Sequence, residues 1–88
     1  MSDPDLALDG EPDVLLDARR LLCPLPVIRT QRQVDEMNRG AVLDVLATDP
    51  GVLQDIPAWC QVHGHEYLGA ERMGREIRCR LRVRHSRA

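Results

Sequence analysis

Lysine and phenylalanine are absent from this chain of 88 residues, and tryptophan and tyrosine occur once each. The core must therefore be built from leucine, valine, isoleucine and alanine, which suits one small domain near the lower size limit for independent folding. No apolar run approaches the roughly 20 residues of a membrane span. The acidic N-terminal stretch lacks the basic and apolar regions of a secretory signal, so we expect a cytoplasmic protein that does not use a membrane.

Charge is distributed unevenly, although the formal net charge is only −2. The first seventeen residues contain six acidic residues and no basic one, whereas the last seventeen contain seven arginines and one glutamate. Such asymmetry can steer a partner, but the overall acidity disfavours direct nucleic-acid binding. We predict one domain at residues 13–84, between a flexible acidic tail at 1–12 and a flexible C-terminal tail at 85–88.

Four strands are predicted from local composition and periodicity. Apolar runs indicate strands at residues 14–18 and 41–47, and a weaker one at 66–71. Apolar residues alternate with arginines along residues 77–84, which predicts a strand with one buried and one solvated face. Its arginines have two further interpretations, a protein-docking surface and an RNA-binding surface, but no aromatic residues alternate with them to stack bases.

Helical spacing predicts one helix over residues 24–38, capped by Gly40, and a second that begins with Asp49 as its N-cap. We expect Pro57 to break or restart the second helix, with Asp55 as a second cap. Right-handed crossovers then give an α+β fold, a two-layer α/β sandwich of order β-α-β-α-β-β. Two helices should cover one face of a mixed four-stranded sheet.

Cys23 lies in the stretch Leu22-Cys23-Pro24-Leu25-Pro26, which opens the first helix. Proline is tolerated in the first turn of a helix, so Cys23 should lie at or next to the N-cap. The helix dipole and the neighbouring Arg19 and Arg20 favour a thiolate there, and we expect the pKa of Cys23 to lie below the ordinary thiol value of about 8.5. The alternative is a buried structural cysteine.

Cys60 and Cys79 share faces with apolar residues and are predicted to be small core side chains. An exposed Cys60 could instead resolve a persulfide or a disulfide on Cys23. The run Cys60-x-x-His63-x-His65 contains zinc-ligand types, but the second spaced pair of a zinc site is missing. We therefore predict neither a metal nor a cofactor.

Asp49 follows the strand at 41–47 as Cys23 follows the strand at 14–18, so the two residues should lie on the same edge of the fold. Neither a Ser/His/Asp set, a phosphate-binding glycine loop nor a dinucleotide fingerprint is present. No histidine is positioned as a base for Cys23, which disfavours a cysteine hydrolase. A thiolate at a helix terminus without a base or a substrate pocket suits the exchange of sulfur atoms.

Several motifs together resemble the TusA/SirA-like sulfur-carrier proteins over about residues 16–83. They are Leu16-Asp17-Ala18, Cys23-Pro24-x-Pro26-Val27, Thr48-Asp49-Pro50, Asp55-Ile56-Pro57-x-x-Cys60 and His65-Glu66. Such proteins have the fold deduced above, which is similar to the C-terminal domain of bacterial translation initiation factor three. The resemblance implies that Cys23 receives sulfane sulfur as a persulfide from a cysteine desulfurase or a rhodanese-like donor and passes it to a downstream acceptor protein.

The resemblance also implies a role for Asp49, which matches a position near the transfer surface. In our own interpretation, Pro24 and Pro26 would make the platform of the thiol rigid, and Arg19, Arg20 and Leu25 would contact partners. Leu25 replaces a glutamate that is frequent in tRNA-thiolation members, Thr48 replaces an aspartate, and Arg20 replaces a glycine.

We interpret the chain as a sulfurtransferase that acts as a monomeric sulfur carrier. tRNA thiolation, molybdenum-cofactor maturation and dissimilatory sulfur oxidation are all compatible pathways. The rival interpretations are a non-catalytic RNA-binding module, a protein-docking regulatory module and a metal-binding domain.

Overall fold

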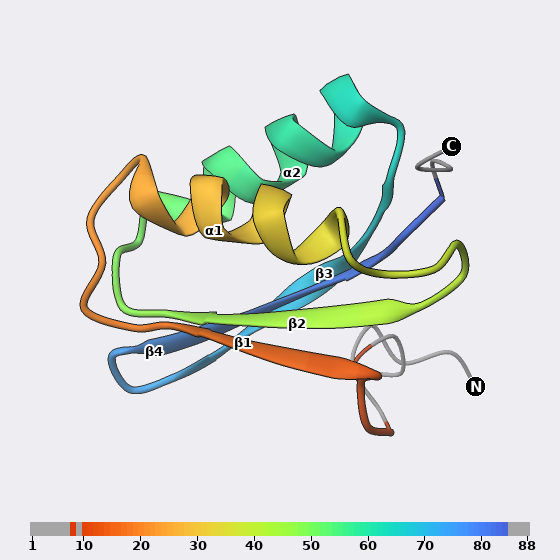
Figure 1. Ribbon diagram of the computed structural model, residues 1–88. Helices are drawn as coiled ribbons and strands as arrows, with labels where there is room; N and C mark the ends of the chain where they lie inside the picture. The colour runs from red at the N-terminus through yellow and green to blue at the C-terminus, as the bar shows by residue number, and fades with distance from the viewer. Residues whose placement is uncertain (1–7, 9, 85–88) are drawn as a thin grey trace.

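The computed structural model describes residue 8 and residues 10–84. The elements in chain order are β1 (Val14–Ala18), α1 (Leu25–Val34), β2 (Val42–Ala47), α2 (Val52–His63), β3 (Glu66–Met73) and β4 (Glu76–Arg82). Both helices lie on one face of a four-stranded sheet with strand order β1-β2-β4-β3 (Figure 1). β1 and β2 are parallel, and β4 is antiparallel to both of its neighbours. The predicted two-layer α+β fold is therefore confirmed.

The core lies between the sheet and the helices and is mainly aliphatic. In the register of β2 against β4, Leu43 pairs with Leu81 and Val45 with Cys79, and all four side chains are buried. Trp59 of α2 is the one large aromatic in this core. Its Nε1 donates a hydrogen bond of 3.1 Å to Gln31 Oε1 of α1, which ties the two helices together.

α1 is shorter than predicted, because it begins after Pro24 and ends at Val34. The N–H groups of Glu36 and Met37 bond to carbonyls three residues earlier, so the chain tightens into a turn that buries Met37 against the core. Gly40 is consequently not the helix cap. It adopts a φ of 92° and donates its N–H to the Val83 carbonyl where the chain enters β2.

α2 is continuous through Pro57, so the predicted break is wrong. A proline inside a helix removes one backbone hydrogen bond. Here the buried side chains of Ile56, Trp59 and Cys60 hold this turn against the core. The N-cap residue is Gly51 and not Asp49. Asp49 instead stabilises the turn before the helix, since its Oδ1 accepts the Gly51 N–H at 3.0 Å.

β3 is two residues longer than predicted and turns into β4 through Gly74, which has a φ of 62°. β4 is an inner strand of the sheet, not an edge. The predicted alternation holds for its apolar side chains, but Arg80 is only 3% exposed. The expectation of a uniformly solvated arginine face is therefore wrong at this position.

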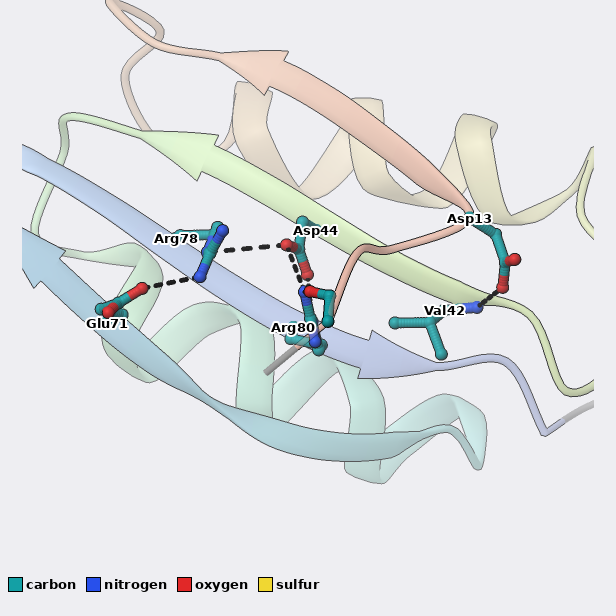
Figure 2. A network of polar contacts seen from close by, with 7 residues as sticks. Asp13, Val42, Asp44, Glu71, Arg78 and Arg80 are labelled. Atoms are coloured by element: carbon teal, nitrogen blue, oxygen red, sulfur yellow. Dashed lines mark hydrogen bonds and ion pairs between the residues drawn. The ribbon is translucent and has the colours of Figure 1, made fainter. Parts of the chain in front are cut away.

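Arg80 is buried because it pairs with a buried acid on the sheet face opposite the helices (Figure 2). Its Nε lies 2.6 Å from Asp44 Oδ1, and its Nη2 donates to Asp44 Oδ2 at 2.9 Å and to the Gly10 carbonyl at 3.0 Å. Arg78 binds Glu71 at 2.7 Å and lies 3.5 Å from the same Asp44 carboxylate. The arginines of β4 are thus matched by acidic residues of β2 and β3.

Of the two predicted tails, residues 1–7, 9 and 85–88 lie outside the described residues. In the part that is described, Leu8 is buried and Gly10 contacts Arg80. Among the helices of the described residues, none has both the length and the apolar content needed to cross a bilayer.

Candidate thiol site

The parallel strands β1 and β2 end at the same end of the sheet (Figure 1). Cys23 and Asp49, in the segments that follow these strands, meet there. The Cys23 N–H donates to Asp49 Oδ2 at 3.0 Å, while Asp49 Oδ1 accepts the Gly51 N–H. These two hydrogen bonds hold the pKa of Asp49 below its usual range. The predicted proximity is confirmed, and one carboxylate joins the loop that carries the thiol to the start of α2.

The prolines shape the backbone beside Cys23, which immediately precedes the N-cap residue Pro24 of α1. The Cys23–Pro24 peptide bond is cis. Pro26 is buried in the first turn, where a missing N–H leaves no hydrogen bond unmade. Its carbonyl accepts the Thr30 hydroxyl at 2.8 Å. Cys23 itself is exposed at the start of this anchored turn.

The thiol of Cys23 has an acidic neighbour that was not predicted as part of the site. Its Sγ lies 3.1 Å from Asp55 Oδ2, on the first turn of α2. The hydrogen bond to Asp55 raises the pKa of Cys23, and desolvation and the charges of Asp55 and Asp49 act in the same direction. The expectation of a lowered pKa is wrong, because the carboxylates of Asp55 and Asp49 both raise the pKa of the thiol and no arginine offsets them.

Arg19 does not stabilise a thiolate, because its guanidinium is bound elsewhere. Its Nε lies 2.9 Å from Asp17 Oδ1 and its Nη1 lies 3.0 Å from Glu76 Oε2. The hydrogen bonds from Arg19 lower the pKa of Asp17 to about 2. Arg19 therefore connects the end of β1 with the start of β4.

Arg20 adopts a φ of 69°, the left-handed region that glycine enters without strain. Its N–H donates to Thr48 Oγ1 at 2.9 Å, which holds the loop in this conformation. A glycine at this position would adopt the same conformation without strain. Here the chain keeps an arginine side chain at the expense of backbone strain.

Three exposed apolar side chains accompany the thiol. Leu22 and Leu25 flank the Cys23-Pro24 pair in sequence and are 71% and 43% exposed, and Ile28 follows Leu25 on α1 with 43% exposed. Leu25, predicted to contact partners, is thus accessible.

The buried cysteines and the two histidines at and just after the end of α2, His63 and His65, take structural positions. Cys60 and Cys79 are buried and free, as predicted, and burial raises the pKa of Cys60 to about 12. The rings of His63 and His65 each lie 5.0 Å from the ring of Trp59. Within residues 8 and 10–84, no three histidine, cysteine or acidic side chains are grouped to hold a metal ion.

Asp55 is the functional candidate that sequence reasoning missed, since it was considered only as a helix cap. The available indication was its position one helical turn after the Asp49-Pro50-Gly51 turn, at the same sheet edge as Cys23. The direction of its side chain depends on Pro57 not breaking α2, which the sequence did not predict.

A family model described as Sulfurtransferase TusA matches residues 14–83. The chain belongs to the TusA family. It is 48% identical over 59 residues to the sulfur carrier protein TusA of Pseudomonas entomophila (strain L48), covering 67% of this chain and 74% of that protein. It is 42% identical over 69 residues to YrkF of Bacillus subtilis (strain 168), covering 78% of this chain but only 37% of YrkF.

The fold is shared with a solved structure as well. The crystal structure of a SirA-like protein from Desulfitobacterium hafniense superposes with a TM-score of 0.72 at 23% identity, over 82% of this chain and 99% of that one. At this level of identity the similarity concerns the TusA-family fold alone.

Proposed function

We propose that this TusA-family protein is a sulfur carrier that holds sulfane sulfur as a persulfide on Cys23. The observation that carries the proposal is the contrast among its three cysteines, all of which lie in the described residues: Cys23 is exposed, and Cys60 and Cys79 are buried. Membership of the TusA family and relatives named sulfur carrier proteins support the same role. The donor would be a cysteine desulfurase or a rhodanese-like protein.

Loading is a thiol–persulfide exchange. The Cys23 thiol gives up its proton, for which Asp55 Oδ2 at 3.1 Å is the nearest acceptor in the site. Its sulfur attacks the outer sulfur of the donor persulfide, a new S–S bond forms on Cys23, and the donor cysteine leaves as a thiolate that takes up a proton. In delivery, an acceptor thiolate attacks the outer sulfur and Cys23 is the leaving group. The sulfur atom is transferred without an external oxidant or reductant.

The raised pKa of Cys23 should make this exchange depend on the bound partner. The free protein keeps the thiol protonated and bonded to Asp55, so it reacts slowly with small electrophiles. A partner that covers the site and weakens the influence of Asp49 and Asp55 would release the thiolate where a sulfur donor is present. The carrier would then be protected between transfers.

The other predicted site residues have supporting roles in this proposal. Asp49 fixes the Cys23 backbone, and Pro24 and Pro26 hold the turn that presents the thiol. Leu25 and Arg20 are exposed for contact with a partner. Arg19 fixes the loop that contains Arg20 through its ion pairs with Asp17 and Glu76. A relay must release its partners, so we propose a monomer that binds them transiently in the cytoplasm.

The test is intact-protein mass spectrometry after incubation with a cysteine desulfurase and cysteine. We expect an adduct of about 32 Da, one sulfur atom, that is removed by a reducing thiol. Cys23→Ser should abolish it, while Cys79→Ala, which also removes one cysteine, should retain it. An adduct that persists in Cys23→Ser would refute the proposal.

A further inference from the structure

An open cleft of about 1070 Å3 borders the thiol site. It is lined by the loop after β1, the turn before α2 and the β3–β4 turn, which lie together at one end of the molecule (Figure 1). Thr48 and Pro50 contribute to its wall, and Asp49 between them holds the Cys23 N–H. A molecule in the cleft would therefore contact the residues on either side of Asp49, the carboxylate that holds the Cys23 backbone.

The cleft carries unbalanced positive charge. Five arginines and two acidic residues line it, and both acids, Asp17 and Glu76, are bound to Arg19. The other four arginines are exposed and form no ion pair within the described residues; these cleft arginines are Arg20, Arg29, Arg72 and Arg75. Unpaired positive charge is thus concentrated beside Cys23, in a protein whose net charge is −2.

The geometry points to this cleft as the docking site for an acidic segment of the protein that exchanges sulfur with Cys23. Guanidinium groups bind carboxylates through paired hydrogen bonds, and several of them spread over one cleft match a run of carboxylates. The volume lies at the upper end of the roughly 300–1,000 Å3 typical of ligand pockets, so a single oxyanion would occupy only a small part of it. Among the described residues that line the cleft, none is an aromatic that could stack a nucleic-acid base.

Charge also defines the orientation of such a partner. The cleft is positive, whereas Asp49 and Asp55 beside the thiol are acidic. Complementary potentials favour one docking orientation and speed association. A partner with its acidic segment in the cleft and an uncharged or basic surface over Cys23 would fit both regions. The identity of this partner rests on the proposed function, because it assumes that Cys23 exchanges sulfur. Binding of an acidic peptide to the cleft can be measured without that assumption.

The test uses fluorescence anisotropy of a fluorescein-labelled peptide of alternating glutamate and glycine, with a glutamine–glycine peptide as the uncharged control, at low ionic strength. Arg72→Glu combined with Arg75→Glu reverses two cleft arginines. Arg32→Glu combined with Arg39→Glu makes the same change in net charge at exposed positions outside the cleft. We expect the cleft variant to weaken binding of the glutamate peptide by about tenfold or more and the control by less than about twofold.

Three results would overturn the docking site. Equal weakening in the two variants would mean that only net charge matters. Displacement of the peptide by sodium sulfate, at an ionic strength where sodium chloride leaves it bound, would indicate a small-anion site. Tighter binding of a single-stranded RNA oligonucleotide with the same dependence on the cleft arginines would indicate a nucleic-acid surface.

Loading of Cys23 by inorganic polysulfide separates this inference from the proposed function, since no protein donor is needed. The cleft variant should load as the unmodified protein does. If Cys23 takes up no sulfur but peptide binding depends on the cleft arginines, the docking site stands and the carrier function fails. If Cys23 is loaded normally and peptide binding does not depend on the cleft arginines, the docking site alone is refuted.

Discussion

Arginine serves two different purposes in two regions of this protein. Along β4 and two residues beyond its end, each arginine from Arg78 to Arg84 contacts an acidic residue of β2 or β3, and Arg80 is almost completely buried. At the end of the sheet beside Cys23, the cleft arginines are exposed and lack ion pairs within the described residues. Identical side chains thus stabilise the sheet in one region and remain available to a partner in the other.

The contrast between paired and unpaired arginines shows how an acidic protein of this size can present a basic surface. The acids on β2 and β3 neutralise the arginines of β4, so those charges do not compete for a partner. Near the thiol, Arg19 forms ion pairs with both acidic residues that line the cleft, Asp17 and Glu76. If this comparison is correct, substitutions in the first region should change stability and those in the second should change reactivity or binding.

Asp44→Asn should have the largest effect on stability. It leaves the Arg80 charge buried without its carboxylate, and breaking a buried ion pair costs about 3–5 kcal/mol of the free energy of unfolding. Urea denaturation followed by circular dichroism measures the loss. The double variant Asp44→Leu with Arg80→Met should recover most of it, and a double variant as unstable as Asp44→Asn would show that the charge is not the cause.

Asp55→Asn should lower the pKa of the Cys23 thiol, because it removes the charge and weakens the hydrogen bond that raise it. Each unit of decrease raises the thiolate fraction about tenfold at pH values below the pKa. The rate of iodoacetamide alkylation against pH reports the shift, with Asp35→Asn as a control at an exposed acid away from the thiol. Unchanged curves for Asp55→Asn would remove Asp55 from the site.

The same substitution has a consequence for stability against pH. A thiol whose pKa is raised in the folded state resists ionisation there, so its contribution to stability is complete below the ordinary thiol pKa and is lost as the pH rises from that value through the raised folded-state pKa. Asp55→Asn should therefore reduce the loss of stability at alkaline pH. Denaturation midpoints across that range measure it, and an unchanged alkaline loss would contradict the prediction.

Arg20→Gly should raise the free energy of unfolding by up to about 1 kcal/mol, since relief of a left-handed conformation outweighs the flexibility that glycine adds to the unfolded chain. Arg20→Ala removes the same side chain but keeps the Cβ, so it should bring no gain. Chemical denaturation compares the two variants. Equal stabilities would mean that the loop is not strained at this residue.

Arg75→Glu should have the smallest effect on stability, within about 0.5 kcal/mol, because this exposed side chain has no ion pair in the described structure. Thermal unfolding of this variant beside Asp44→Asn tests the contrast between the two regions directly. A loss comparable with that of Asp44→Asn would show that the cleft arginines also hold the fold together.

Local patterns predicted most of the fold. The alternation of Ile77, Cys79 and Leu81 fixed the buried face of β4, and Pro24 and Pro26 placed Cys23 beside the start of α1. The pairing of Asp44 with Arg80 could not be predicted in this way, because it joins residues 36 positions apart through the register of β2 against β4.

The candidate site shows the same limit. Its edge location followed from parallel strands, which bring Cys23 and Asp49 together. The electrostatic state of the thiol could not be predicted in this way, because it depends on where Asp55 and Arg19 direct their side chains. Closeness in sequence suggested that arginine governs the sulfur, whereas the contacts in space assign that influence to carboxylates.

Arg19 also sets the dimensions of the cleft. Its bonds to Asp17 and Glu76 connect the loop that leads to Cys23 with the start of β4, and all three residues line the cleft. These ion pairs are partly exposed and are therefore weakened by salt. Rising ionic strength would then act twice, by screening the cleft arginines and by loosening the connection between that loop and the start of β4. Partner binding should fall with salt more steeply than charge screening alone requires.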